Sequence, residues 1–376
     1  MVKTYTTIQG DMWDGIAKKM YGTERAINIL LEANQQHNNT VIFSAGVELT
    51  VPDYEPPRVD NLSGEADTLD LTLEDRKGIW QNEWLPEKGA TLNASLNAEN
   101  WQSISGTATM QLGLFEIDEL TSSGYPSEVQ IRSVSVPDNN NLRGVERTRS
   151  WEKAELKTIC NDVATGAEME LFYDTEQNPT IDRAEQTEQS DLAFLLGLAQ
   201  DQGLALKIYE KKIVIFDEAD YEKEEAKITI VKPGTIDFSQ DGKKITELLS
   251  YSFKNKVRDI YKACHVKYQQ GKTKTAIEAT FTAPEKTKGK TLEIREQAEN
   301  IADAERLAKK RLREKNKEEW TASISVMGNF NLVAAVTVNL KGFGVFDGKY
   351  IVTRASHSIG NGYTTDIEIR RCLNGY

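Results

Sequence analysis

The sequence has few of the residues on which disulfide frameworks and metal sites depend. It holds 3 cysteines and 3 histidines in 376 residues. Cys160, Cys264 and Cys372 are widely separated and odd in number, so their spacing favours neither disulfide pairing nor metal binding. We expect buried or free thiols, with Cys160 in the apolar stripe of a helix.

Enzyme signatures are also missing. His37, His265 and His357 belong to no His-x-x-x-His, Gly-x-Ser-x-Gly or Cys-His pattern, and His357 is expected to be a hydrogen-bonded structural residue. A glycine group at 342, 344 and 348 lacks the phosphate-loop spacing and precedes a strand, which favours turns. We therefore predict a protein with no catalytic residues, no cofactor and no metal.

Long apolar runs are absent as well. No segment approaches the ~20 apolar residues of a membrane-spanning helix, and the first residues lack the apolar core of a signal peptide. The formal charge of −12 argues against a dedicated nucleic-acid binder, which needs clustered lysine and arginine. We expect no membrane contact, no sequence-specific nucleic acid and assembly in the cytoplasm. An acidic surface would also suit a channel through which DNA passes.

What is present begins with a compact segment, residues 1–53. Lys3 to Ile8 alternates like a strand, Asp11 stands as the N-cap of a helix, and Thr23 caps a second helix. A strand at 47–51 follows, which gives the order strand, helix, helix, strand. Prolines at 56 and 57 make residues 54–58 a stiff linker and mark the first domain boundary.

The remainder is predicted to hold three further parts. Residues 59–147 are rich in alternating strands, and the alternation slips near Phe115, as at a β-bulge. Residues 148–220 form a small α+β insert, with helices over 150–164 and from Ser190, separated by a polar stretch over 174–188. Residues 221–376 return to strands around one long helix, 292–317, whose acidic start and basic end complement the helix dipole and favour a solvated face.

The first segment resembles the LysM fold, and still more closely phage tail protein X. The resemblance rests on Tyr5 to Asp14, Ile16-Ala17, Tyr21-Gly22, Leu31 to Asn34 and Val41 to Val47. LysM domains bind N-acetylglucosamine polymers in a groove between two loops, whereas in tail proteins they more often join protein parts. The residues that would line this groove are Gln9, Gly10, Asp11, Asn38, Asn39 and Thr40. They fit a glycan site, a protein-docking site, or simple capping and turn residues.

Residues 59–372 resemble the late-control D family of phage baseplate hub proteins. The resemblance rests on several segments in order, among them Arg149-Ser150-Trp151, Gln186 to Leu195, Gly328 to Leu332, Val338 to Gly344, Gly348 to Val352 and His357-Ser358-Ile359. It implies an α+β, mainly β, fold: a LysM module (βααβ) followed by two antiparallel β-barrel-like domains with a small α+β insert and one long helix.

That resemblance also implies a function. Three chains would form a ring of six similar barrels that joins the tail tube to the central spike of a contractile phage tail or tailocin. Expected partners are two further copies, the spike protein, the tube protein and the baseplate wedge or sheath-proximal proteins, with peptidoglycan as a possible ligand of the LysM module. The alternative is a cell-wall-binding protein or muramidase that uses LysM to reach peptidoglycan.

Overall fold

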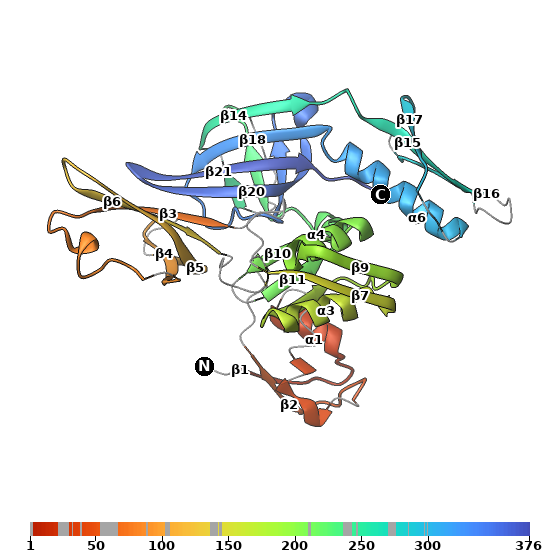
Figure 1. Cartoon of the computed structure of the whole chain (residues 1–376), viewed down its shortest axis with the longest axis horizontal. Coiled ribbons are helices and arrows are strands. Elements are labelled where there is room, and N and C mark those ends of the chain that lie inside the picture. Colours follow the sequence, from red (N-terminus) through yellow and green to blue (C-terminus); the bar gives the residue numbers. More distant parts are fainter. Residues whose placement is uncertain are drawn as a thin grey trace. The chain divides into compact units, whose positions relative to one another are not determined.

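A computed structural model of the chain forms two compact units, residues 1–58 and 59–376, each considered by itself (Figure 1). The structure describes residues 3–21, 30–31, 33–37, 40–52, 67–87, 89–101, 106–135, 142, 145–209, 212–235, 243–245, 247–269, 276–284, 286–296, 298 and 300–376.

The first unit pairs a two-stranded sheet with a helix. Its elements are β1 (Lys3–Thr6), α1 (Trp13–Tyr21), the short helix η2 (Gln35–His37) and β2 (Glu48–Val51). The strands run antiparallel, with Lys3 opposite Val51. Ile16 and Leu49 are fully buried, and the Trp13 and Phe43 rings meet edge to face at 4.8 Å. The apolar stripe of the helix therefore packs on the sheet, as the sequence predicts.

Two predictions for this unit need comment. Asp11 is not the N-cap: α1 begins at Trp13, the Met12 carbonyl accepts from Ile16 N, and the Asp11 carboxylate accepts from Ile8 N upstream. A short acidic side chain can satisfy the turn before a helix as well as the helix itself. The predicted second helix and its cap Thr23 lie mostly outside the described residues, although Leu30 and Leu31 are helical.

The second unit begins with a four-stranded antiparallel sheet of order β3-β6-β5-β4. Its strands are β3 (Thr68–Glu74), β4 (Thr91–Glu99), β5 (Thr107–Ser123) and β6 (Glu128–Val134). The register on β5 shifts at Leu112 and again at Asp118, on either side of Phe115 where the sequence alternation slips. Bulges of this kind bend a strand, so that β5 pairs with β4 along its first half and with β6 along its second.

A small α+β segment follows. Its elements are β7 (Glu146–Glu155), α3 (Leu156–Gly166), β8 (Glu170–Asp174), β9 (Thr180–Ser190), α4 (Asp191–Gln202), β10 (Ala205–Tyr209), β11 (Lys212–Phe216) and α5 (Glu218–Lys223). The stripe Leu156, Ile159, Cys160 and Val163 is fully buried, and the Ser190 hydroxyl accepts from Ala193 N, which confirms the predicted cap.

One boundary in this segment was predicted wrongly. Residues 150–155 belong to strand β7 rather than to a helix, and the polar stretch 174–188, for which no element was predicted, contains most of strand β9. The two strands pair antiparallel, with Trp151 opposite Ala184. Ladder hydrogen bonds between segments some thirty residues apart decide the conformation here, and a local helical period does not reveal them.

The largest sheet has seven strands, in the order β13-β12-β19-β20-β21-β18-β14. They are β12 (Ile228–Val231), β13 (Lys243–Ile245), β14 (Leu248–Asn255), β18 (Trp320–Met327), β19 (Thr337–Lys341), β20 (Gly348–Gly360) and β21 (Gly362–Arg371). The β12 strand runs parallel to both of its neighbours, so the sheet is mixed. Aromatic rings bridge its open side: Phe253 of β14 stacks on Phe346 of the short helix η4 (Gly344–Phe346) at 4.6 Å.

A separate module is inserted between β14 and β18, which are neighbours in that sheet. It holds β15 (Tyr261–Gln269), β16 (Ala276–Thr282), β17 (Lys290–Ile294) and α6 (Ile301–Asn316) around its own core. The predicted long helix 292–317 therefore starts too early. Residues 290–294 form a strand parallel to β15, and the helix begins after Asn300, whose side chain accepts from Asp303 N.

Candidate functional site

The groove predicted in the first unit is formed by two loops that lie side by side. Gly10 N donates to Phe43 O at 3.0 Å, and Phe43 N donates to Asp11 O at 2.8 Å. The structure thus brings Gln9, Gly10 and Asp11 beside Thr40, while Asn38 and Asn39 lie outside the described residues. Gln9 and Gly10 are exposed, and Asp11 and Thr40 are half-buried.

Internal hydrogen bonds occupy the Asp11 carboxylate and the Thr40 carbonyl. The Asp11 carboxylate accepts from Tyr5 OH and from Ile8 N, both at 2.8 Å, and the bond from Ile8 N in particular lowers the pKa of Asp11. The carbonyl of Thr40 accepts from the Trp13 indole at 2.9 Å. A glycan site needs polar groups that are available to sugar hydroxyls, and these groups serve the fold instead.

Apolar side chains occupy the exposed surface of the same loops. Ile8 and Met12 flank the first loop, with exposed fractions of 59% and 41%. Val41 and Ile42 stand on the second loop and are 73% and 60% exposed. We call these four residues the apolar rim. None of the four was predicted as a site residue, although the Val41-Ile42 pair directly after a polar loop is a visible signal.

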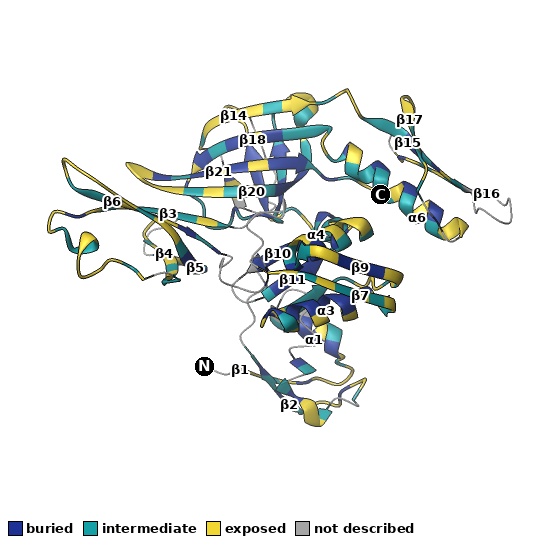
Figure 2. Cartoon of the chain, in the orientation of Figure 1, coloured by how far each residue is buried: buried dark blue, intermediate teal, exposed yellow. Residues whose placement is uncertain are grey.

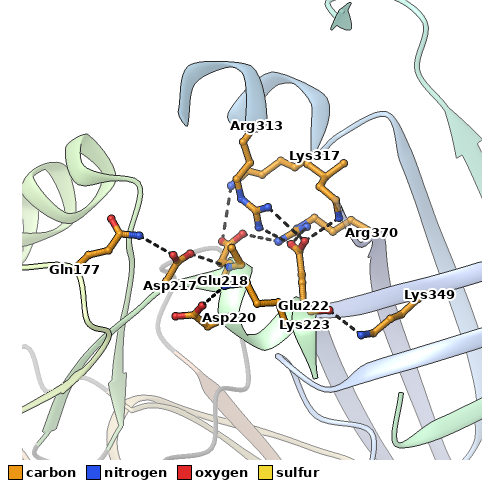
Figure 3. A network of polar contacts seen from close by, with 12 residues as sticks. Gln177, Asp217, Glu218, Asp220, Glu222, Lys223, Arg313, Lys317, Lys349 and Arg370 are labelled. Carbon is orange, nitrogen blue, oxygen red and sulfur yellow. Dashed lines mark hydrogen bonds and ion pairs between the residues drawn. The ribbon is translucent and has the colours of Figure 1, made fainter. Parts of the chain in front are cut away.

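The second unit contains a cluster of charged side chains around α5 (Figure 3). Arg370 of β21 lies 2.5 Å from Glu218 and 2.5 Å from Glu222, and Arg313 of α6 lies 2.6 Å from Glu222. Lys317 approaches Glu218 at 3.8 Å. The Glu222 carboxylate also accepts from Leu373 N at 2.8 Å. We call this cluster the charged brace, because it joins α5, α6, β21 and the C-terminal segment.

The central side chains of the brace are buried. The side chains of Glu222 and Arg370 are 3% and 6% exposed, so each charge depends on the opposite charge beside it. Burial alone would raise the pKa of Glu218, but Arg370, Lys317 and Arg313 outweigh it and hold that pKa below its ordinary value. The charges at the end of α6 were predicted to be solvated, whereas Arg313 is half-buried and pairs with Glu222.

The brace borders a cleft of about 1290 Å³ between the α+β segment and α6. On its wall, Lys310 donates to the Asp201 carbonyl at the C-terminal end of α4, and burial lowers the pKa of Lys310 to about 8. The hydrogen bond satisfies a carbonyl at the end of the helix, while burial disfavours the charged form of the lysine. The hydrogen bond joins α4 to α6.

The remaining candidates for chemistry have structural roles. His357 accepts from Tyr363 OH at 2.7 Å and donates to Leu332 O at 3.1 Å, as predicted. Burial raises the pKa of the Cys160 thiol to about 12, which leaves it unreactive. Among the residues that the structure describes, no group of three or more histidine, cysteine or acidic side chains could hold a metal ion, and no helix is long and apolar enough to cross a membrane.

Comparison with known families decides what kind of protein carries these features. Residues 121–363 match the model of the phage tail baseplate hub (GPD) family, which is more than half of the chain. The chain belongs to this hub family. Residues 3–59 of the hub chain match Phage Tail Protein X, so a tail X module is fused to a hub body.

A curated relative agrees with this assignment, and two solved structures share the fold. The hub chain is 27% identical over 194 residues to a probable baseplate hub protein of Escherichia phage 186, a match that covers 51% of the hub chain and 46% of that relative. Its fold resembles a tail protein from Neisseria meningitidis MC58, with a TM-score of 0.59 at 11% identity over 83% of this chain and 90% of that one. It also resembles a 43 kDa tail protein of prophage MuSo2 from Shewanella oneidensis, with a TM-score of 0.54 at 13% identity over 85% and 95% of the two chains.

Proposed function

We propose that the hub chain is a structural part of a phage-tail or tailocin baseplate, where three copies form a ring that joins the tail tube to the central spike. Family membership carries the proposal. In this proposal residues 59–147 and 221–376 are the two barrel-forming parts, and residues 148–220 lie between them in sequence. Wedge or sheath-proximal proteins are further partners.

The two sheets of the second unit supply physical support. In β3 and β4, the edge strands of the first sheet, every second residue is half-buried and none is buried (Figure 2). Leu71 and Leu96 are among these half-buried apolar residues. Edge strands with open hydrogen-bonding groups and a partly exposed apolar face are stabilised when another chain covers them. A closed ring repeats such a contact until no edge is left.

The molar mass in solution tests the ring. We expect sedimentation at high concentration to give three times the 42.2 kDa mass of the chain, or this mass plus that of the spike when the purified spike protein is added. A chain that stays monomeric in both conditions contradicts the proposal, because assembly would then require more than these partners.

For the tail X module we propose docking to a neighbouring baseplate protein rather than to glycan. Support comes from the groove, where the polar groups of Asp11 and Thr40 serve the fold, and from the apolar rim beside it. Exposed aliphatic side chains bury well against a protein surface, whereas they offer sugars neither hydrogen bonds nor aromatic faces.

A pull-down on purified peptidoglycan separates the two readings. We expect no retention of the full chain beyond that of a chain lacking residues 1–58. Strong retention that this deletion abolishes would favour the cell-wall alternative.

A variant of the apolar rim tests the docking itself. The double variant Val41→Asp and Ile42→Asp should keep the melting temperature of the wild type while it reduces incorporation into particles.

No catalytic step is part of the proposed function. The energy of assembly comes from buried edges and apolar faces, and the acidic net charge of −12 would place like charge around passing DNA. Charge mapping of the assembled ring tests this last point, which a basic channel would contradict.

A further inference from the structure

Three exposed apolar side chains and the half-buried Trp80 lie at one end of the first sheet of the second unit. Trp84 and Leu85 are 57% and 58% exposed, Tyr125 is fully exposed, and the Trp80 ring meets Trp84 edge to face at 5.6 Å. We call these four residues the tryptophan tip. Exposed tryptophan and tyrosine grouped in one place are typical of the centre of a protein interface.

Hydrogen bonds bring the two segments of the tip together. Trp80, Trp84 and Leu85 lie between β3 and β4, and Tyr125 lies in the turn between β5 and β6. Asp75 N donates to Ser127 O at 2.8 Å, and the Gln81 amide donates to the Ser122 hydroxyl. The connection after β3 therefore lies against the turn that carries Tyr125.

The tip is held in its conformation. The buried Asp75 carboxylate accepts from Ile79 N at 2.9 Å and from Trp80 N at 3.3 Å. Gly78 takes the left-handed conformation at φ 63°, and Trp84 N donates to Ile79 O at 2.9 Å. A surface that is already ordered loses little conformational entropy when it binds.

The body of its own chain contacts the opposite end of the sheet. There the Trp101 indole donates to Gly328 O at 2.7 Å, beside the start of β5. The tip lies at the other end of β5, a strand of 17 residues, which corresponds to roughly 50 Å along the strand. We infer that the tip contacts a different molecule.

Charge indicates which molecule this is. Glu83 and Glu87 flank Trp84 and Leu85, and neither carboxylate forms an ion pair with a described residue. A complementary surface stands on the bend after β14, where Val257 is 82% exposed between the exposed cations Lys254 and Arg258. We call Lys254, Val257 and Arg258 the cationic bend. Asp259 follows Arg258, Lys254 lines a pocket with Glu318 and Glu368, and Glu318 is paired with Lys256 at 2.6 Å.

We propose that the tryptophan tip of one hub chain binds the cationic bend of a second copy. Val257 packs on Trp84 and Leu85, and the two cations meet Glu83, Glu87 and the faces of the rings. The contact joins two different surfaces of identical chains, so it propagates around a ring. The inference rests on the proposed ring, and it assigns to that ring one of its contacts.

Cysteine cross-linking of the full chain tests the contact directly. The variants Leu85→Cys and Val257→Cys are mixed and oxidised, and we expect a disulfide-linked pair of chains that contains one of each. The three native cysteines among the described residues are buried and do not compete. The matched control replaces Val257→Cys by Val345→Cys, at a site that is 72% exposed. Equal cross-linking with the control, or none with either, overturns the inference.

Charge reversal provides a second, independent readout. Glu83→Lys with Glu87→Lys, or Lys254→Glu with Arg258→Glu, should each weaken self-association about tenfold, and the chain with all four changes should recover it. If wild-type chains associate and none of these changes alters the affinity, the contact is wrong while the ring stands. Chains that neither associate nor cross-link contradict both. Loss of another baseplate protein from tip-variant particles, with chain association unchanged, would assign the tip to that protein and overturn the inference.

Discussion

Replacement of Arg370 by glutamine removes the central cation of the charged brace. Glu222 keeps Arg313 as a partner and Glu218 keeps Lys317, but both carboxylates stay buried, with 3% and 12% of their side chains exposed. Breaking a buried pair costs about 3 to 5 kcal/mol, and the remaining cations place Arg370→Gln near the lower end, at about 3 kcal/mol. The assay is urea unfolding at pH 7, followed by tryptophan fluorescence and circular dichroism.

Two controls make this prediction sharp. Arg306 pairs with Asp303 on the surface and is 53% exposed, so Arg306→Gln should change the free energy of unfolding by less than about 1 kcal/mol. The folded-state pKa of Glu218 is lowered, so its ion pair stabilises the fold above the unfolded pKa near 4.5 and loses this effect as the pH falls through the folded value. The difference between wild type and Arg370→Gln should therefore shrink on acidification. A loss below about 1 kcal/mol at pH 7, or a difference independent of pH, refutes the reasoning.

Three further outcomes are expected. Gly328→Ala would place its Cβ 2.0 Å from the Tyr363 ring, so thermal unfolding should occur at a clearly lower temperature, whereas Gly360→Ala, with open space around it, should leave that temperature nearly unchanged. The pKa of Lys310 is lowered to about 8 in the folded protein, so its protonated form opposes folding. The free energy of unfolding of the wild type, relative to that of Lys310→Met, should therefore rise between about pH 8 and 10. A difference that stays constant with pH contradicts this. Ser190→Ala removes the cap of α4 and should cost about 1 kcal/mol in urea unfolding, and no measurable loss would show that the cap is dispensable.

Local patterns predicted the parts of the fold that local contacts determine. The stripe through Cys160, the cap at Ser190 and the structural role of His357 follow from spacing and residue type, and the structure confirms each of them. The start of α6 was misplaced because residues 290–294 alternate weakly and become a strand only through their ladder with β15. Parallel pairing is a long-range property that a short window of sequence does not record.

The candidate sites divide in the same way. The loops that hold Gly10 and Thr40 were located from the sequence, but the hydrogen bonds that occupy their polar groups were not, since these join residues up to 33 positions apart. The charged brace was missed for a similar reason. Arg313, Glu222 and Arg370 come from three distant segments, and a charge pattern along one helix predicts solvent rather than a buried partner.

The module between β14 and β18 is inserted in a way that allows related chains to carry a different segment in its place. Asn255 and Trp320 are partners across the ladder, so the module enters and leaves the sheet at adjacent positions. A shorter turn, or a foreign domain whose ends lie close together, can replace it without rethreading the strands. The module contributes Arg313, which pairs with Glu222, so a replacement that presents no cation there leaves Glu222 to share Arg370 with Glu218.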